Sequence, residues 1–482
     1  MIGVVQHGVR AFKGIPFARA DRFRRATPVP PWDAPLRATE FGPVAPQRGH
    51  VSVAGEAACL TLNIWTPAEA SHSLLPVLFF IHGGAFVTGA GSDYDGNHLA
   101  KTGPAVIVTI NYRLGALGFL QLHRLGGALR DANNLAITDV LAALDWVRAN
   151  IAAFGGDPDA ITLCGQSAGA SLVVTLMTLP AARAKFARSI AFSMPGRGIM
   201  PATQGDDIAD RLLAALELQP RDADRIITAP LEQIFAATDR VGREVAEQTA
   251  HGTLFGPVLD GAIIPRDPRD AVCDGVVRGQ NLWLGCCRDE MAMFLRSDPP
   301  AAMIRVTEAN VRASFGDAGW ERLLTCYRYT ARGHEDPREA LLSDAMWHRP
   351  MAELARLQSD AGGQVWLSRF DHRPQLEPFL SQGPTHGADN ACLWAHLPDF
   401  VERPVLGRAG GAMTADDIEV ATRLQTGVLR FATEGRPADE TIWPRFEPGS
   451  SRLAIFDNPF RVVTAADTPR QRMWLALDHR CP

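Results

Sequence analysis

The chain has 482 residues, of which 46% are hydrophobic and 21% charged, and its formal net charge is −5. These ordinary globular values give no reason to expect a nucleic acid or an anionic membrane as a partner. A chain of this length can bury a large core without disulfide bonds.

The N-terminal sequence has none of the features of a secretory signal, since residues 1–18 contain no apolar core of the needed length. The longest apolar run, residues 74–81, is too short to span a bilayer. The eight cysteines form no CxxC pair, so we expect free thiols in a reducing compartment. The sequence therefore predicts a cytoplasmic protein without a membrane segment, and its oligomeric state stays open.

Short apolar, β-branched runs, most of them followed by glycine-rich turns, recur along the chain and predict strands buried on both faces of a mostly parallel sheet. The five clearest runs begin at Val77, Ala105, Ala160, Asn281 and Val365. Helical patterns lie between them. One covers residues 139–154, with Asp139 as the expected N-cap, and another covers residues 416–433 and ends before Gly435.

This alternation of strands and helices predicts an α/β fold with a mostly parallel central sheet flanked by helices. Without repeats or linkers, we expect a single catalytic domain over residues 1–482. Helical patterns near residues 200–255 and 296–360 interrupt the alternation. We interpret them as insertions that cover the edge of the sheet where a substrate pocket would lie.

The strongest local motif is the G-x-S-x-G sequence of residues 165–169, which stands between a predicted strand and a predicted helix. In this setting the serine occupies a sharp turn from which its hydroxyl projects beyond the sheet. Glycine fits at 165 and 169 because larger side chains would collide with the strand and the helix. The motif indicates that Ser167 is a nucleophile, whereas the alternative is an ordinary turn of small residues.

A second glycine-rich segment, His82-Gly83-Gly84-Ala85, directly follows the predicted strand at residues 77–81. Loops of this type supply backbone N–H donors to the oxyanion that forms during acyl transfer. We expect Gly84, Ala85 and Ala168 to supply these donors, with Gly83 shaping the oxyanion-hole loop.

These motifs together resemble the type-B carboxylesterases, which include cholinesterases and bacterial para-nitrobenzyl esterases. The resemblance runs through most of the chain and implies the α/β-hydrolase fold. It rests on GVRAFKGIPFA from Gly8, CLTLNIWTP from Cys59, HGGAFVTGAGSDYDG from His82, NYRLGALGFL from Asn111, FGGDPDAITLCGQSAGA from Phe154, GPVLDG from Gly256, RDEMAMFL from Arg288 and THGADN from Thr385.

Carried over residue by residue, the resemblance implies a triad of Ser167, Glu290 and His386. The residues themselves favour these positions less strongly. Thirteen histidines compete for the role of base, and His386 is marked by its glycine-flanked loop beyond a late strand. Glu290 follows the strand from Asn281, where active sites of parallel sheets lie, but Asp289 competes with it.

Two further carboxylates near these motifs, Asp260 and Asp389, are expected to be structural. The chain also departs from the family. Ala57 and Ala58 replace an acidic pair, so we expect a structural ion pair to be absent there, and Cys59 has no earlier cysteine to bridge. Met291 replaces the glycine after the acid.

The resulting hypothesis is a serine esterase that hydrolyses small-molecule carboxylic esters through an acyl-enzyme on Ser167, without metal or cofactor. An amidase, a carbamate hydrolase or a lactonase could use the same triad, because a fold and a triad do not fix the substrate. The alternative outside enzymes is a non-catalytic interaction module on the same fold.

Overall fold

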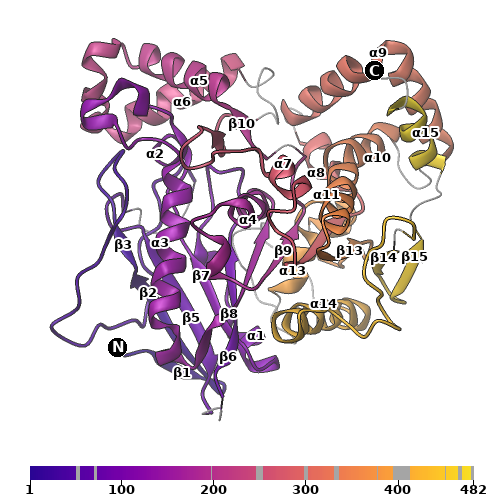
Figure 1. Ribbon diagram of the computed structural model, residues 1–482, viewed down its shortest axis with the longest axis horizontal. Coiled ribbons are helices and arrows are strands. Elements are labelled where there is room, and N and C mark those ends of the chain that lie inside the picture. The colour runs from indigo at the N-terminus through magenta and orange to yellow at the C-terminus, as the bar shows by residue number, and fades with distance from the viewer. Residues whose placement is uncertain are drawn as a thin grey trace.

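An eleven-stranded sheet runs through the computed structural model of the protein (Figure 1). From one edge to the other its strands are β1 (Val4–Gln6), β2 (Val9–Pro16), β5 (Thr61–Pro67), β7 (Val106–Ile110), β6 (Leu75–Ile81), β8 (Gly156–Gln166), β9 (Arg188–Phe192), β12 (Asn281–Cys287), β13 (Gln364–Phe370), β14 (Arg452–Phe456) and β15 (Arg461–Thr464). The structure describes residues 1–49, 55–69, 73–196, 198–245, 253–297, 302–330, 336–376, 378–394, 413–450, 452–464 and 469–478.

The strands from β7 to β14 pair in parallel, and the pairs at both edges of the sheet are antiparallel. The prediction of a mostly parallel sheet is therefore confirmed, and the five predicted runs form β6, β7, β8, β12 and β13. Two small two-stranded sheets lie outside it, formed by β3 (Ala18–Arg19) with β4 (Thr27–Pro28) and by β10 (Met200–Pro201) with β11 (Val258–Leu259).

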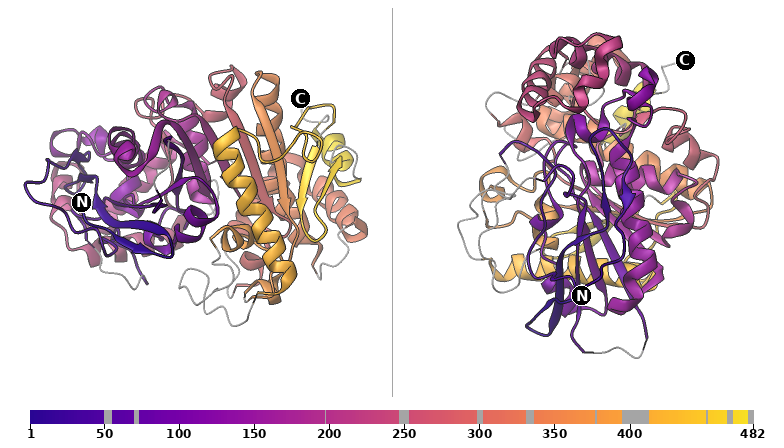
Figure 2. Two further views of the ribbon diagram at one scale, coloured as in Figure 1. Left: turned by 90° about the horizontal axis from the view of Figure 1, so that it is seen from below. Right: turned by 90° about the vertical axis from the view of Figure 1, so that its left-hand side faces the viewer.

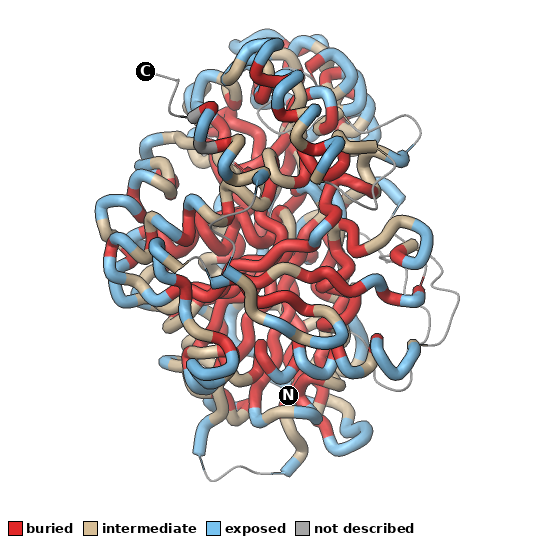
Figure 3. The backbone as a smooth tube through the Cα atoms, turned by 90° about the vertical axis from the view of Figure 1, so that its right-hand side faces the viewer, coloured by how far each residue is buried: buried red, intermediate tan, exposed pale blue. Residues whose placement is uncertain are grey.

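Side chains of β6 show why the central strands are apolar along their whole length. Val77, Phe79 and Ile81 point into one core, which they share with helices on one face of the sheet. Leu78 and Phe80 point into a second core on the other face. All five are fully buried, and the buried backbone through the centre of the molecule is plain in Figure 3. A strand covered on both faces must be apolar at every position.

Helices cover both faces of this sheet. The α-helices are α1 (Asn97–Thr102), α2 (Gly115–Phe119), α3 (Leu135–Asn150), α4 (Ala168–Thr178), α5 (Ala202–Ala215), α6 (Leu231–Val245), α7 (Pro268–Cys273), α8 (Ala292–Leu295), α9 (Ala302–Thr330), α10 (Pro337–Ser343), α11 (Arg349–Asp360), α12 (Phe379–Gln382), α13 (Ala388–Leu393), α14 (Ala415–Glu434) and α15 (Pro469–Asp478). A π-helical turn, η7 (Asp344–His348), joins α10 to α11. Short 3₁₀ turns are η1 (Gly91–Asp93), η2 (His123–Leu125), η3 (Gly127–Leu129), η4 (Ile151–Phe154), η5 (Arg183–Lys185) and η6 (Pro220–Ile227).

Helix α14 agrees with its sequence prediction. Thr414 caps its N-terminus by accepting from the Asp417 backbone N–H, and Gly435 ends it in the left-handed conformation. Its buried face packs against strands of the sheet, as the left view of Figure 2 shows.

The prediction for the other helix was wrong at its start. Helix α3 begins at Leu135, so Asp139 lies inside the helix and is not its cap. The Asp139 carboxylate is fully buried and binds the Arg113 guanidinium through two hydrogen bonds of 2.6 and 2.7 Å. A carboxylate in this position serves a buried ion pair that ties the helix to the segment after β7.

Two groups of helices stand at the same end of the molecule. Figure 1 places α5 and α6 on one side of it and α9, α10 and α15 on the other. Apart from α15, which is the C-terminal helix, they lie in the segments near 200–255 and 296–360 in which the sequence predicts helical insertions.

The region of Ala57 and Ala58 has an ion pair after all. Arg22 binds the carboxylate of Glu56, one residue earlier, with one contact of 2.7 Å. The expectation that this ion pair is absent is therefore wrong. The seven described cysteines are free thiols, and Cys481 lies outside the described residues. Over the residues that the structure describes, no helix is long and apolar enough to cross a membrane.

Candidate active site

Ser167 occupies the junction between the end of β8 and the start of α4. Its φ and ψ angles are 57° and −122°, a conformation that is strained for a residue other than glycine. The packing explains the two glycines of the motif. A Cβ on Gly165 would lie 2.4 Å from the Gly169 carbonyl oxygen, and one on Gly169 would lie 2.0 Å from that of Ile81. The turn therefore presents Ser167, which is partly exposed, on an otherwise buried backbone.

Glu290 and His386 come together beyond the carboxyl end of β12. The His386 imidazole Nδ1 lies 2.5 Å from Glu290 Oε2. The other carboxylate oxygen, Oε1, accepts hydrogen bonds from the Ser193 hydroxyl at 2.6 Å and from the Cys287 backbone N–H at 2.7 Å. Glu290 is fully buried, so these contacts compensate for the loss of water around its charge.

The other imidazole nitrogen of His386 faces the serine turn. Its Nε2 lies 3.3 Å from the side-chain amide nitrogen of Gln166, the residue before Ser167. Because Gln166 donates there and Glu290 accepts at Nδ1, the ring is neutral with its proton on Nδ1. Within the described residues no hydrogen bond joins the Ser167 hydroxyl to this ring, and contacts of this kind often tighten only when substrate binds.

The loop after β6, in which the sequence predicts the oxyanion hole, has a strained backbone. Gly84, Ala85 and Phe86 all have positive φ angles, of 106°, 51° and 64°. Gln47 holds the far end of the loop, because its side-chain oxygen accepts from the Thr88 hydroxyl and the Gly89 N–H, each at 2.7 Å.

Close packing places this loop against the serine turn. A Cβ on Gly83 would lie 2.7 Å from the Gln166 carbonyl oxygen and 3.0 Å from the Ser167 Cβ. The Gly83 backbone itself is hydrogen-bonded to the buried Tyr94 hydroxyl. In the described part of the chain, the N–H groups of Gly84, Ala85 and Ala168 have no acceptor. Three backbone donors thus stay available.

Comparison with known proteins shows the family of the chain. The model of the Carboxylesterase family matches residues 2–474. This chain belongs to the carboxylesterase family. It is 30% identical to the para-nitrobenzyl esterase of Bacillus subtilis (strain 168), over 98% of this chain and 96% of that protein. It is 35% identical to the phenmedipham hydrolase of Pseudarthrobacter oxydans, over 94% of this chain and 92% of that protein.

Solved structures give the same result. A thermophilic para-nitrobenzyl esterase superimposes with a TM-score of 0.86 at 30% identity, covering 98% of this chain and 97% of that one. The chain therefore has the α/β-hydrolase fold and is a serine carboxylesterase, an enzyme that hydrolyses carboxylic esters.

The carboxylate that competes with Glu290 in this carboxylesterase, and a second carboxylate expected to be structural, have other partners. Asp289 binds the neighbouring Arg288 at 2.8 Å and has no hydrogen bond to His386 among those of the described residues. Asp260 accepts from the side-chain amides of Asn133 and Asn134 at 2.6 and 2.8 Å, which is the structural role expected of it.

Asp389 is buried behind the site. Burial, followed by the charge of Glu290, raises the pKa of Asp389 to about 6. Two buried carboxyl groups in one site disfavour simultaneous ionisation. Asp389 therefore keeps its proton to a higher pH than an exposed aspartic acid does.

Several features of the site were missed by the sequence reasoning. Ser193 belongs to none of the motifs that the sequence offers, yet its hydroxyl donates to Glu290. The rings of Phe294 and Trp347 lie 5.4 and 5.5 Å from the His386 ring, centroid to centroid. No local pattern marks these residues, because their roles follow from contacts between distant segments.

Proposed function

We propose that Ser167, His386 and Glu290 are the catalytic triad of this carboxylesterase, and that Gly84, Ala85 and Ala168 supply the oxyanion hole. The observation that carries the proposal is the orientation of His386. Its Nδ1 is bound to Glu290 and its Nε2 faces the serine turn. A neutral imidazole in this orientation is a general base for the serine hydroxyl.

The reaction follows in two steps of acyl transfer. His386 Nε2 takes the proton of Ser167 while the serine oxygen bonds to the ester carbonyl carbon. The negative oxygen that results accepts hydrogen bonds from the three free N–H groups. The imidazolium, stabilised by Glu290, then gives its proton to the leaving alcohol, and an acyl-enzyme forms. Water repeats the sequence, with His386 as base, and releases the carboxylic acid.

Apolar side chains beside the oxyanion-hole loop favour an uncharged ester as substrate. The ring of Phe86 packs against that of Phe119 with 5.1 Å between centroids. A neighbouring pocket has an apolar lining that includes Phe119, Met200, Ile208 and Phe255. The apolar rings beside the loop would contact an apolar acyl or alcohol group more favourably than a charged one.

Two further proposals concern the whole chain. We propose a single catalytic domain over residues 1–482, because the family model extends over residues 2–474. We also propose a cytoplasmic location, because the seven described cysteines are free thiols, as in a reducing compartment.

Covalent labelling with a fluorophosphonate, combined with hydrolysis of a short-chain para-nitrophenyl ester, tests the triad. The matched pair of variants is Ser167→Ala and Ser171→Ala, since Ser171 is a buried serine one turn further along α4. The wild type and Ser171→Ala should take the label at Ser167 and hydrolyse the ester, and Ser167→Ala should do neither while staying folded. Turnover retained by Ser167→Ala would refute the assignment.

A further inference from the structure

The segment from α10 to η7 contacts the backbone on two sides of Glu290. The Ser343 hydroxyl accepts a hydrogen bond of 2.9 Å from the N–H of Met291, the residue after Glu290. The indole N–H of Trp347 donates to the Ser193 carbonyl oxygen at 3.2 Å. Ser193 in turn donates to Glu290. One short segment thus binds the backbone of Ser193, whose hydroxyl donates to Glu290, and the backbone of Met291, which follows Glu290 in the sequence.

His348 provides a third contact, to the remaining partner of Glu290. Its Nε2 lies 2.9 Å from the carbonyl oxygen of Cys287, whose N–H donates to Glu290. Its Nδ1 lies 2.5 Å from the Asp344 carboxylate. Both neighbours are acceptors, so both ring nitrogens must carry a proton and the ring is an imidazolium. His386, by contrast, faces one acceptor and one donor.

The electrostatic surroundings support this charged state. Burial disfavours the cation, but the neighbouring Cys286 and Asp344 outweigh it and raise the pKa of His348 well above its usual value. Burial likewise raises the pKa of Asp344, yet the bond with His348 outweighs it and holds that pKa below its usual value. The pair therefore persists as an ion pair, which fixes the direction of both imidazolium N–H groups.

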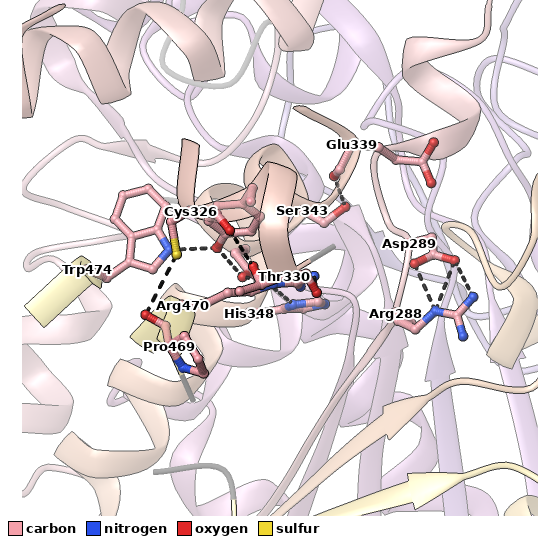
Figure 4. A network of polar contacts seen from close by, with 12 residues as sticks. Arg288, Asp289, Cys326, Thr330, Glu339, Ser343, His348, Pro469, Arg470 and Trp474 are labelled. Atoms are coloured by element: carbon pink, nitrogen blue, oxygen red, sulfur yellow. Dashed lines mark hydrogen bonds and ion pairs between the residues drawn. The ribbon is translucent and has the colours of Figure 1, made fainter. Parts of the chain in front are cut away.

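The outer side of this ion pair is tied to the end of the chain. The Tyr327 hydroxyl, on α9, binds Asp344 and accepts a hydrogen bond of 2.8 Å from the indole N–H of Trp474 on α15. Arg470, also on α15, lies 3.9 Å from Asp344. Figure 4 draws His348 between Arg470 and Trp474 on one side and the Arg288–Asp289 pair on the other.

We infer that His348 is a positioning residue for the catalytic acid, because its bond to the Cys287 carbonyl fixes the turn that presents Glu290 to His386. This inference rests on the proposed function, since it takes Glu290 as the acid of the triad. The bond acts on the loop between the end of β12 and Glu290, where a shift of the carboxylate would turn His386 away from Ser167. The π-helical turn η7 suits this role, because such turns are rare and often occur at functional sites.

Two substitutions separate the contacts of His348. In His348→Gln, the amide nitrogen takes the place of Nε2 and still donates to Cys287. In His348→Asn, the shorter amide takes the place of Nδ1 and reaches only toward Asp344. We expect His348→Asn to lower kcat for a para-nitrophenyl ester about 10- to 100-fold with little change in KM, because small displacements of catalytic groups cost that much. His348→Gln should restore most of kcat.

His372→Asn is the matched control. His372 forms a buried pair with Asp417 at 2.7 Å, and it has no hydrogen bond to Ser193, Cys287 or Met291 among those of the described residues. Active sites are counted with a fluorophosphonate, and kcat per labelled site is measured well below the unfolding midpoint. A wild type that takes no label would overturn the triad itself. Equal kcat in His348→Asn and His372→Asn, with labelling intact, would overturn the positioning role alone.

Discussion

The substitution Glu290→Gln tests the acid through the tautomer of His386. Glu290 Oε1 accepts hydrogen bonds from Ser193 and Cys287, and Oε2 faces the imidazole Nδ1. In the variant, the amide oxygen must stay with the two donors, which directs the NH₂ group at Nδ1. The ring then accepts at Nδ1 and carries its proton on Nε2, so it cannot take the proton of Ser167.

The size of the effect follows from this wrong tautomer. Replacing a triad carboxylate by its amide lowers kcat by roughly 10⁴-fold in a serine protease with intact geometry. A loss of that size corresponds to about 5 kcal/mol of barrier. The carboxylate of Glu290 is fully buried and bound by two donors on Oε1. The amide that replaces it cannot turn toward water, so we expect the full loss of kcat.

Steady-state hydrolysis of para-nitrophenyl acetate, together with thermal unfolding, measures the outcome. Asp289→Asn is the control, because Asp289 is the adjacent carboxylate but binds Arg288. Glu290→Gln should unfold near the wild-type temperature with kcat lowered by about four orders of magnitude, and Asp289→Asn should keep most of its activity. The reverse pattern, with Asp289→Asn inactive and Glu290→Gln active, would refute the reasoning.

Three further outcomes are expected. Gly169→Ala, whose Cβ would lie 2.0 Å from the Ile81 oxygen, should lower the free energy of unfolding in urea by about 3 kcal/mol or more; unchanged stability would contradict this packing. Burial and Glu290 raise the pKa of Asp389 to about 6, so the wild type loses stability as pH rises from the usual pKa of an aspartic acid to this value. The free energy of unfolding of Asp389→Asn should therefore rise relative to that of the wild type as pH rises from about 4 to 6, to a limit of about 3 kcal/mol. A difference in the free energy of chemical unfolding that does not change with pH would contradict this. Gln166→Glu places a carboxylate 3.3 Å from His386, so the acidic limb of the pH–rate profile should move upward by about one pH unit; an unmoved limb would contradict this contact.

The parts of the fold that could be predicted are those buried on two faces. Strand β6 is apolar along most of its length because both of its faces pack against a core. A continuous apolar run of this kind can be recognised in the sequence alone. The edge strand β1 is largely exposed and carries no comparable pattern. The start of α3 was missed because Asp139 resembles a cap locally, whereas its partner Arg113 lies 26 residues away.

The site shows the same division between local and distant information. The serine turn could be predicted because its glycines are required by contacts with adjacent segments. The base could not be deduced from the residues alone, since three histidines of the described residues lie against carboxylates: His348 against Asp344, His372 against Asp417, and His386 against Glu290. Only the last has a ring nitrogen that faces the serine turn. The order of strands β8, β9, β12 and β13 in the sheet brings the segments that carry Ser167, Glu290 and His386 together.

The three consecutive left-handed residues of the oxyanion-hole loop bear on how the enzyme tolerates heat. Residues 84–86 keep this shape only while the surrounding contacts, Gln47 among them, hold it in place. Warming should relax this loop while the sheet beneath it is still intact, so inactivation precedes denaturation. A more durable catalyst would therefore come from strengthening the few contacts around this loop, and a tighter core alone would leave its working lifetime unchanged.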